Sequence, residues 1–347
     1  GFLIQLAFPE QRVGPPLTEE QSAALRRLEA EFSDLPMKRW TVAMALHDNS
    51  DPDSAVASFF ILLDETRSDA PAGPDRNRLA EAMAFAADTY QQVLHRESAG
   101  EPGRDYLKRR GIDSAMARAW GIGFSPADRE YLLARAQRAG FTVDELADAG
   151  LCYRPAEGRG PADRFTRRVM FPIWSTRDQI VGFGGRAISD DQRGKYINSA
   201  EGPLFQKSRL LYGYDRVNRA RRERPELREA PVYVAEGYLD VIGLHAAGLE
   251  TAVAPLGTAL TADHVRVLRP SGNAVVLVFD GDRAGQDATR RAIGELMRQD
   301  VEVQVTRPSP GGDPFSVFQE QGAEALRALV EDTVADYAFL LESAMAV

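Results

Sequence analysis

The chain has 347 residues, of which 44% are apolar and 27% charged, an ordinary globular composition with room for two or three domains. Its single cysteine, Cys152, excludes an intramolecular disulfide and a cysteine-rich zinc site. No apolar stretch reaches the ~18 residues of a membrane span, and no secretory signal is present, so a cytoplasmic protein without a membrane partner is expected.

The net charge of −9 is unevenly distributed along the chain. Residues 101–230 hold 25 Lys and Arg against 18 Asp and Glu, whereas the remaining residues hold 17 against 33. A basic part therefore lies beside an acidic part. This split indicates either a half that binds a polyanion or arginines scattered over an ordinary surface, and charge alone leaves both interpretations open.

The first 77 residues show no recognisable chemistry and are expected to form a separate segment and a linker. A capping-box pattern at Thr18 predicts a helix through about residue 32. Two short apolar runs, 42–46 and 55–63, follow. The stretch 68–77 contains Pro and Gly and is predicted to be the linker.

A helical pattern runs from Arg78 to His95, and a set of short helices is expected between about residues 106 and 146. From 163 to 213, apolar residues alternate with basic ones and predict short strands with cations on exposed faces. These cations are Arg164, Arg168, Arg186, Lys195, Lys207 and Arg209. Cations interleaved with aromatic residues suit a polyanion with stackable bases.

Within this stretch, Gly182-Phe-Gly-Gly185 predicts a backbone that a partner approaches closely, because glycine carries no Cβ. Residues 214–230, which contain six arginines, are expected to form a solvated helix and a connector.

Residues 231–325 alternate between strand-like and helix-like segments. The expected strands are 231–235, 251–254, 274–279 and 301–306, and the expected helices are about 238–247, 261–268, 283–298 and a short one at the end. Such alternation predicts a parallel sheet with helices on both faces. The final stretch, 323–345, is predicted to be helical and to pack back on the sheet.

Carboxylates follow three of these strands at the point where each strand ends. Glu236-Gly-Tyr-Leu-Asp240 follows the first strand, Asp280-Gly-Asp282 the third and Gly311-Gly-Asp313 the fourth. In an open α/β sheet, ligands bind at the carboxyl ends of the strands. Carboxylates that converge there repel one another unless a cation such as Mg²⁺ lies between them. The residues alone therefore predict a metal-dependent phosphoryl-transfer site.

The combination of Glu236-Gly-Tyr-Leu-Asp240, Leu256-Gly-Thr258, Asp280-Gly-Asp-Arg-Ala-Gly285 and Asp313-Pro resembles the Toprim domain. The stretches from Asp163 to Ile173, Gly182-Phe-Gly-Gly-Arg186, Lys195-Tyr-Ile-Asn-Ser199 and Lys207-Ser-Arg209 narrow the resemblance to bacterial DnaG-type primases, over about residues 80–345.

The resemblance implies an α/β RNA-polymerase core. A mixed α/β basic subdomain is expected at 78–230, a Toprim-type parallel sheet flanked by helices at 231–325, and the start of a helical tail at 326–347. The implied activity is nucleotidyl transfer, in which short RNA primers are made from ribonucleoside triphosphates on a single-stranded DNA template. The implied cofactors are two or more Mg²⁺ or Mn²⁺ ions.

The resemblance also implies roles for individual residues. Glu236, Asp280 and Asp282 are implied as catalytic residues, and together with Asp313 and Asp240 as metal ligands. Glu236 is either a ligand or a general base for the 3′-hydroxyl, and Asp240 acts directly or by supporting another ligand. Nucleotide and template are assigned without division to Arg164, Arg168, Arg186, Lys195, Asn198, Lys207 and Arg209.

Three departures from the family pattern shape the expectations. Residues 1–75 contain no cysteine, so neither a zinc ribbon nor bound zinc is expected, and no helicase-binding domain is expected in this chain. Phe315 stands where the family usually has Asp, which removes one carboxylate. In the full-length family, a replicative helicase and a single-strand-binding protein at the bacterial replisome are implied partners. A nuclease- or topoisomerase-like Toprim enzyme and a catalytically idle DNA-binding remnant remain the alternatives.

Overall fold

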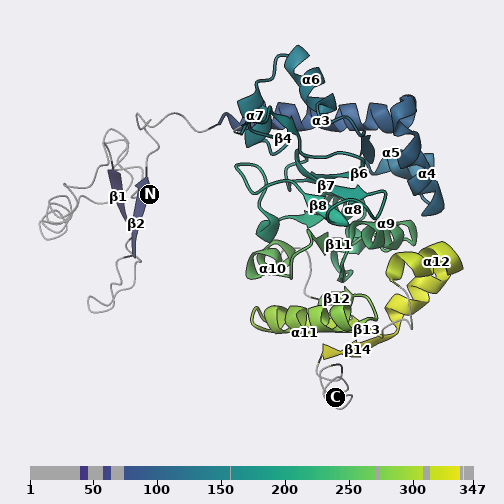
Figure 1. The fold of residues 1–347 in the computed structure, drawn as a ribbon. Helices are drawn as coiled ribbons and strands as arrows, with labels where there is room; N and C mark the ends of the chain where they lie inside the picture. Colours follow the sequence, from purple (N-terminus) through teal and green to yellow (C-terminus); the bar gives the residue numbers. More distant parts are fainter. Residues whose placement is uncertain are drawn as a thin grey trace, which may run out of the picture. The chain divides into compact units, whose positions relative to one another are not determined.

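The computed structural model describes residues 40–45, 58–63, 74–156, 158–269, 274–307, 313–336 and 339, in two compact units, Gly1–Gly73 and Pro74–Val347 (Figure 1). In the first unit, strand β1 (Trp40–Ala45) pairs antiparallel with β2 (Ser58–Leu63). The helix expected at 18–32 and most of the expected linker lie outside the described residues.

The described part of the second unit contains two large sheets, of four and six strands, and one two-stranded sheet. Up to residue 230 its elements are α3 (Arg76–Arg96), η1 (Ser98–Gly100), α4 (Glu101–Arg109), α5 (Ser114–Ala119), β3 (Gly123–Ser125), α6 (Tyr131–Arg138), α7 (Val143–Asp148), β4 (Cys152–Tyr153), β5 (Ala162–Asp163), β6 (Arg168–Trp174), β7 (Ile180–Ala187), β8 (Tyr196–Asn198), η2 (Lys207–Arg209), β9 (Leu211–Tyr212), α8 (Tyr214–Glu223) and η3 (Pro225–Arg228). The helix expected from residue 78 and the short helices after it are confirmed, with β3 lying between two of them.

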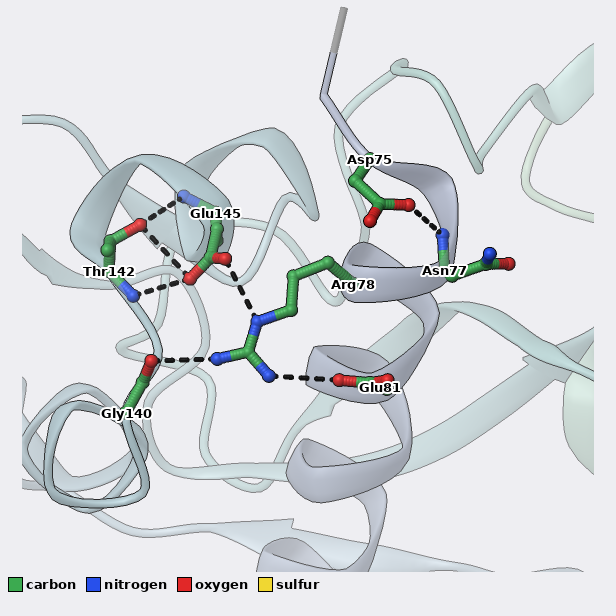
Figure 2. Close-up of polar contacts among 7 residues, drawn as sticks. All are labelled: Asp75, Asn77, Arg78, Glu81, Gly140, Thr142 and Glu145. Carbon is green, nitrogen blue, oxygen red and sulfur yellow. Dashed lines mark hydrogen bonds and ion pairs between the residues drawn. The ribbon is translucent and has the colours of Figure 1, made fainter.

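Polar contacts fix the start of α3 against the start of α7. The guanidinium of Arg78 donates to the carboxylate of Glu145 and to the carbonyl of Gly140 (Figure 2). Glu145 also accepts from the backbone N–H of Thr142, whose hydroxyl in turn accepts from the N–H of Glu145. This reciprocal pair satisfies two N–H groups that a helix start leaves without partners. The Arg78 side chain, at the start of α3, is therefore held against the first turn of α7.

The first sheet is antiparallel, in the order β3-β6-β7-β8. Its alternating side chains separate two cores, because successive residues of a strand point to opposite faces. Met170 packs in the core that contains Met83 and Tyr90 of α3. Val169 and Phe171, on the opposite face, belong to a second core that continues into the other sheet.

The second sheet follows residue 230. Its elements are β10 (Val232–Ala235), α9 (Tyr238–Ala246), β11 (Ala252–Pro255), α10 (Ala262–Leu268), β12 (Ala274–Val278), α11 (Arg283–Met297), β13 (Glu302–Thr306), α12 (Pro314–Glu331) and β14 (Thr333–Ala335). The strand order is β14-β13-β12-β10-β11-β9. The four central strands are parallel, and the two edge strands run antiparallel to their neighbours.

Helices cover both faces of this sheet, as the strand–helix alternation predicts. Val234 of β10 packs in the core with residues of α8, α10 and α11. Its neighbour Ala235 packs in the core with residues of α9 and α12. Figure 1 shows α10 and α11 on one side of β12 and β13, and α9 and α12 on the other.

The C-terminal part differs from the prediction. The helix expected to be short is α12, of 18 residues, which is kinked at Gly322 where φ is +87°. The expected helix at 323–345 is wrong at Thr333–Ala335, because these residues form β14 and pair antiparallel with β13. The strand satisfies backbone groups of β13 that an edge position would leave unpaired.

Candidate active site

The three strand ends that carry carboxylates lie at one edge of the second sheet. Strands β10, β12 and β13 are parallel neighbours, so their carboxyl ends bring Glu236, Asp280 and Asp313 together. These three residues and Asp240 line a cavity of about 200 Å³. The convergence expected from the sequence is therefore present.

Asp280 is held at the centre of this edge. Its backbone N–H donates to Oε1 of Glu236 at 3.0 Å, which joins the ends of β10 and β12. Its Oδ1 is buried and has no hydrogen-bond partner among the described residues. Gly285 makes this approach possible, because a Cβ there would lie less than 3.0 Å from the Asp280 carbonyl and from Oε1 of Glu236.

Burial and mutual repulsion raise the pKa values of these acids. Burial raises the pKa of Asp280 to about 6, and Glu236, Asp313 and Asp282 push it in the same direction. Burial also raises the pKa of Glu236, against the opposing effect of the Asp280 N–H. Negative charge at this edge is therefore destabilised unless positive charge arrives.

Asp240 lies at the back of the cavity and is 8% exposed. Its two oxygens accept from the backbone N–H groups of Gly237, at 3.0 Å, and Phe315, at 3.2 Å. The carboxyl group thus joins the start of α9 to the start of α12. Burial, then Asp280 and Asp313, raises its pKa to about 8.

Phe315 does not direct a polar side chain at the site. It is 2% exposed, its ring centroid lies 6.2 Å from that of Phe318, and a Cβ on Gly243 would lie 3.1 Å from it. The ring fills the core between α9 and α12, and the backbone N–H alone reaches a site carboxylate.

Asp282 and Asp313 each cap a helix. Oδ1 of Asp282 accepts from the N–H of Gly285 at the start of α11, and Oδ1 of Asp313 accepts from the N–H of Ser316 at the start of α12. Each carboxylate keeps a second oxygen that is not used in the cap. Asp313 lines the cavity directly, and Asp282 lies two residues beyond Asp280.

Three cations face the acids across the same cavity: Arg110, Arg186 and Lys195. The guanidinium of Arg186 lies 5.1 Å from the ring of Tyr196 and 5.7 Å from that of Tyr106. Arg110 lies 5.9 Å from the Tyr106 ring. The sequence interpretation missed Arg110, because it is one of three consecutive cations at a helix end and only the fold brings it to the acids.

Arg168 is not on an exposed face, so this prediction is wrong. The side chain is 5% exposed, and its guanidinium donates to the carbonyls of Gly185, Arg193 and Gly194. Strand β6 lies inside the sheet, between β3 and β7, and the loop before β8 folds over the side chain. A buried guanidinium stabilises the fold only when its donors are paired, as they are here.

Asn198 is occupied by the protein itself. Its Oδ1 accepts from the Tyr238 hydroxyl at 2.6 Å, and its Nδ2 donates to the carbonyl of Leu256 at 2.6 Å. Its own carbonyl accepts two hydrogen bonds from Arg164. The side chain therefore ties β8 of the first sheet to α9 and to the loop after β11.

The glycines of β7 allow close contact, but the partner is the protein itself. A Cβ on Gly184 would lie less than 3.0 Å from the Tyr238 ring, and one on Gly182 equally close to Phe205. The rings of Phe171 and Tyr238 are stacked, 5.3 Å apart. The short residues let the first sheet dock against the start of α9.

Lys207 and Arg209 lie outside the cavity, on the turn η2 just before β9. Because β9 runs antiparallel to β11, this turn lies at the same edge as the carboxylates. Three strand spacings, about 14 Å, separate β9 from β12 along that edge. The edge is thus acidic at one end and basic at the other.

A larger cavity of about 390 Å³ lies among α3, α4 and α5. Asp113 is its single lining carboxylate, so it lacks the acid cluster on which the proposed chemistry depends.

Within the described ranges, no three His, Cys, Asp or Glu side chains are already arranged to hold a metal ion. The unpartnered buried Oδ1 of Asp280 nevertheless fits a cation, which would satisfy it and relieve the repulsion. No helix in the described part of the chain is long and apolar enough to cross a bilayer.

Comparisons with known proteins agree with this architecture. Residues 89–218 match the family described as DNA primase catalytic core, N-terminal domain, and residues 230–307 match the Toprim domain. Over 281 residues the chain is 37% identical to the DNA primase of Mycobacterium tuberculosis, an alignment that covers 78% of this chain and 43% of that protein. The chain therefore spans less than half the length of this relative.

Two solved structures share the fold. The RNA polymerase domain of Mycobacterium tuberculosis primase DnaG is similar with a TM-score of 0.71 at 35% identity, over 79% of this chain and 89% of that chain. A DnaG primase catalytic domain bound to single-stranded DNA gives 0.69 at 34% identity, over 78% and 83%. The sheet with its acidic edge, the basic subdomain beside it and these similarities show that the chain belongs to the DnaG-type bacterial primase family.

Proposed function

We propose that the chain synthesises short RNA primers on single-stranded DNA by nucleotidyl transfer. The observation that carries the proposal is the cavity in which Arg110, Arg186 and Lys195 face Glu236, Asp280 and Asp313. A nucleoside triphosphate with its cation needs both kinds of group, cations for the phosphates and carboxylates for the metal. The similar catalytic domain bound to single-stranded DNA supports the choice of template.

The carboxylates Glu236, Asp280, Asp282 and Asp313 would hold two or more Mg²⁺ or Mn²⁺ ions. Bound ions of this kind neutralise charge on transferring phosphates and lower the pKa of a hydroxyl nucleophile. Asp280 supplies the buried oxygen that lacks a partner. Glu236 would either hold an ion or accept the proton of a 3′-hydroxyl, and burial raises its pKa in the direction that favours accepting a proton.

Asp240 acts mainly as a positioning residue in this proposal. Both its oxygens are engaged by backbone N–H groups that start α9 and α12. These bonds set the direction in which Glu236 leaves β10 and Asp313 enters α12. Burial and the charges of Asp280 and Asp313 raise its pKa to about 8 when no cation is bound, and a cation bound at those neighbours would lower it.

The cations divide between nucleotide and template. Arg110, Arg186 and Lys195, inside the cavity, would meet the triphosphate, for which the forked guanidinium is well shaped. Lys207 and Arg209, at the basic end of the edge, would meet template phosphates. Arg168 and Asn198 serve the fold rather than a ligand, because protein groups already occupy their side chains.

Other functions for the same edge make different predictions. A nuclease- or topoisomerase-like enzyme would cleave the strand it binds and would not need ribonucleotides. A catalytically idle remnant would bind DNA and synthesise nothing. The basic wall of the cavity favours a polymerase, because a triphosphate substrate brings more negative charge to the site than a single phosphodiester.

The partners proposed beyond template and nucleotides are a replicative helicase and a single-strand-binding protein. Family membership alone supports these two.

Incubating the chain with single-stranded DNA, labelled ribonucleotides and Mg²⁺ or Mn²⁺ tests the proposal. Short, alkali-sensitive products that vanish with EDTA are expected. Arg110→Ala should raise KM for ribonucleotides about 10- to 100-fold and leave DNA affinity within about twofold, since a lost charge-assisted hydrogen bond costs ~1.5–3 kcal/mol. DNA cleavage without synthesis would replace the proposal with the nuclease alternative, and tight DNA binding without any product would replace it with the remnant.

A further inference from the structure

An exposed aromatic ring lies on the basic subdomain, away from the acidic cavity. Tyr153 is 50% exposed, and among the described residues Met297 is the other large hydrophobic side chain with comparable exposure, at 55%. Tyr153 ends β4, which pairs with β5 through Cys152 opposite Asp163 and Tyr153 opposite Ala162. The Cys152 side chain packs in the core, so the pleat directs the ring outward from a fixed backbone.

A cation lies beside this ring. The guanidinium carbon of Arg164 is 5.6 Å from the Tyr153 ring centroid. Two hydrogen bonds from Arg164 to the carbonyl of Asn198, at 3.1 and 2.9 Å, fix the guanidinium in place. Ring and cation are therefore presented together by β4 and by the residue that follows β5, with the guanidinium already held in place.

The same residues connect the ring to the cavity. Asn198 ends β8, and Tyr196 and Lys195, at the other end of that strand, line the cavity. Three residues of strand span about 10 Å. A strand of nucleic acid that passes over Tyr153 and Arg164 can follow β8 directly to the cavity, with cations at both ends of the path.

We infer that Tyr153 and Arg164 form a stacking site for an unpaired nucleobase of the template strand. This inference rests on the proposed function and names a contact that positions the template before it reaches the cavity. The ring stacks on the base, and the adjacent guanidinium attracts the phosphate that follows it. An exposed tyrosine could instead bind a protein, but a cation fixed at its side and a basic path to the cavity favour a polyanion with bases.

Fluorescence anisotropy with a labelled single-stranded oligonucleotide tests the inference in the full chain. Tyr153→Ala should weaken binding roughly 5- to 150-fold, the range for one lost aromatic–base stack. Tyr153→Phe, which keeps the ring, should bind like the wild type. Met297→Ala, the equally exposed control on α11, should also leave binding unchanged.

A second set of oligonucleotides separates base stacking from a general loss of affinity. In each one, a single nucleotide is replaced by an abasic site. An abasic site at one position of the strand should weaken binding by the wild type about as much as Tyr153→Ala does. An abasic site at that position should not weaken binding by Tyr153→Ala any further. The inference is overturned if Tyr153→Ala binds the oligonucleotide as tightly as the wild type does. It is also overturned if the substitution weakens binding to a fully abasic strand by as much as it weakens binding to a normal strand. A Tyr153→Ala chain that binds DNA normally but fails to bind a protein partner overturns it as well.

The outcome is independent of catalysis. If the wild type synthesises RNA but Tyr153→Ala binds DNA normally, the inference fails and the proposed function stands. If the wild type synthesises nothing but the abasic pattern depends on Tyr153, the proposed function fails and the stacking site stands.

Discussion

Replacing Asp280 with Asn removes one charge from the crowded edge of the second sheet and keeps the shape of the side chain. In the absence of a divalent cation, the carboxylate costs stability, because burial and its acidic neighbours raise its pKa from 3.8 to about 6. At 1.36 kcal/mol per pKa unit the cost approaches ~3 kcal/mol, and solvent screening of this partly exposed group reduces it to on the order of 1–2 kcal/mol.

The sign of the pH dependence follows from the same values. The folded-state pKa lies above the unfolded value, so the stability of the wild type relative to Asp280→Asn falls as the pH rises from about 4 to about 6. Above that range the variant should be the more stable protein in EDTA. At an unfolding entropy of ~2.1 cal/mol/K per residue, the gain corresponds for this chain to a Tm higher by roughly 1–4 °C.

Mg²⁺ should reverse the order. A ligand that binds only the folded state raises its stability by RT ln(1 + [L]/Kd), and the wild type keeps the carboxylate that the variant has lost. Thermal denaturation followed by circular dichroism, in EDTA and across a Mg²⁺ titration, measures both effects. Asp88→Asn, at an exposed position on α3, controls for a change of net charge and should do neither. A variant that is less stable than the wild type in EDTA would refute the repulsion on which the site is argued.

Three further predictions concern the frame of the site. Gly184→Ala should lower the free energy of unfolding, measured by urea denaturation, by ~1–3 kcal/mol, because the new Cβ would collide with the Tyr238 ring. The control Gly294→Ala, which has open space around it in α11, should raise it by about 0.5–1 kcal/mol. Equal effects of the two substitutions would contradict the docking of the first sheet on α9. Asn198→Ala should lower the free energy of unfolding by ~2–4 kcal/mol in the same measurement, because it leaves the Tyr238 hydroxyl and the Leu256 carbonyl without partners. A decrease under about 0.5 kcal/mol would show that solvent replaces both hydrogen bonds. Burial lowers the pKa of His245 to about 4, so the unfolded chain takes up the proton first, and between pH 7 and pH 5 the wild type should lose on the order of 1–2 kcal/mol relative to His245→Asn; parallel pH profiles of the two proteins would contradict this.

The acidic edge could be predicted because it depends on order along the chain. Glu236 and Asp280 directly follow apolar runs of strand length, and alternation with helices makes those strands parallel neighbours. Parallel neighbours end at the same edge, so the sequence already determines which carboxylates meet. The structure adds the unpartnered Oδ1 of Asp280 and the cap that turns one oxygen of Asp313 away.

The roles of the basic residues were harder to predict, because a sequence does not show which cations form hydrogen bonds within the fold. Arg168 and Arg164 have the same side chain and neighbouring positions, yet one is buried under the loop before β8 and the other lies beside an exposed ring. Arg110 reaches the cavity from a helix end more than 120 residues before Glu236. These outcomes depend on long-range packing, and local residue patterns carry no signal for it.

The C-terminal error has a similar cause. The stretch after α12 has helix-forming neighbours, but β13 would otherwise be an unpaired edge, and Thr333–Ala335 satisfies it. Pairing with β13 outweighs the local helix propensity of these residues. Phe315 shows the same principle, since its side chain packs in the core and its backbone N–H serves the site.

Primer synthesis and template binding measured side by side for Asp280→Ala test the central claim most directly. The acidic edge is proposed to act on the reacting phosphates and the basic surfaces to hold the template, so the two activities should separate. Synthesis from labelled ribonucleotides should fall at least about 100-fold, since a lost metal ligand removes several kcal/mol of charge stabilisation, while the Kd for single-stranded DNA should stay within about twofold. Synthesis that persists, or synthesis and DNA binding lost together, would contradict the assignment of this edge as the catalytic centre.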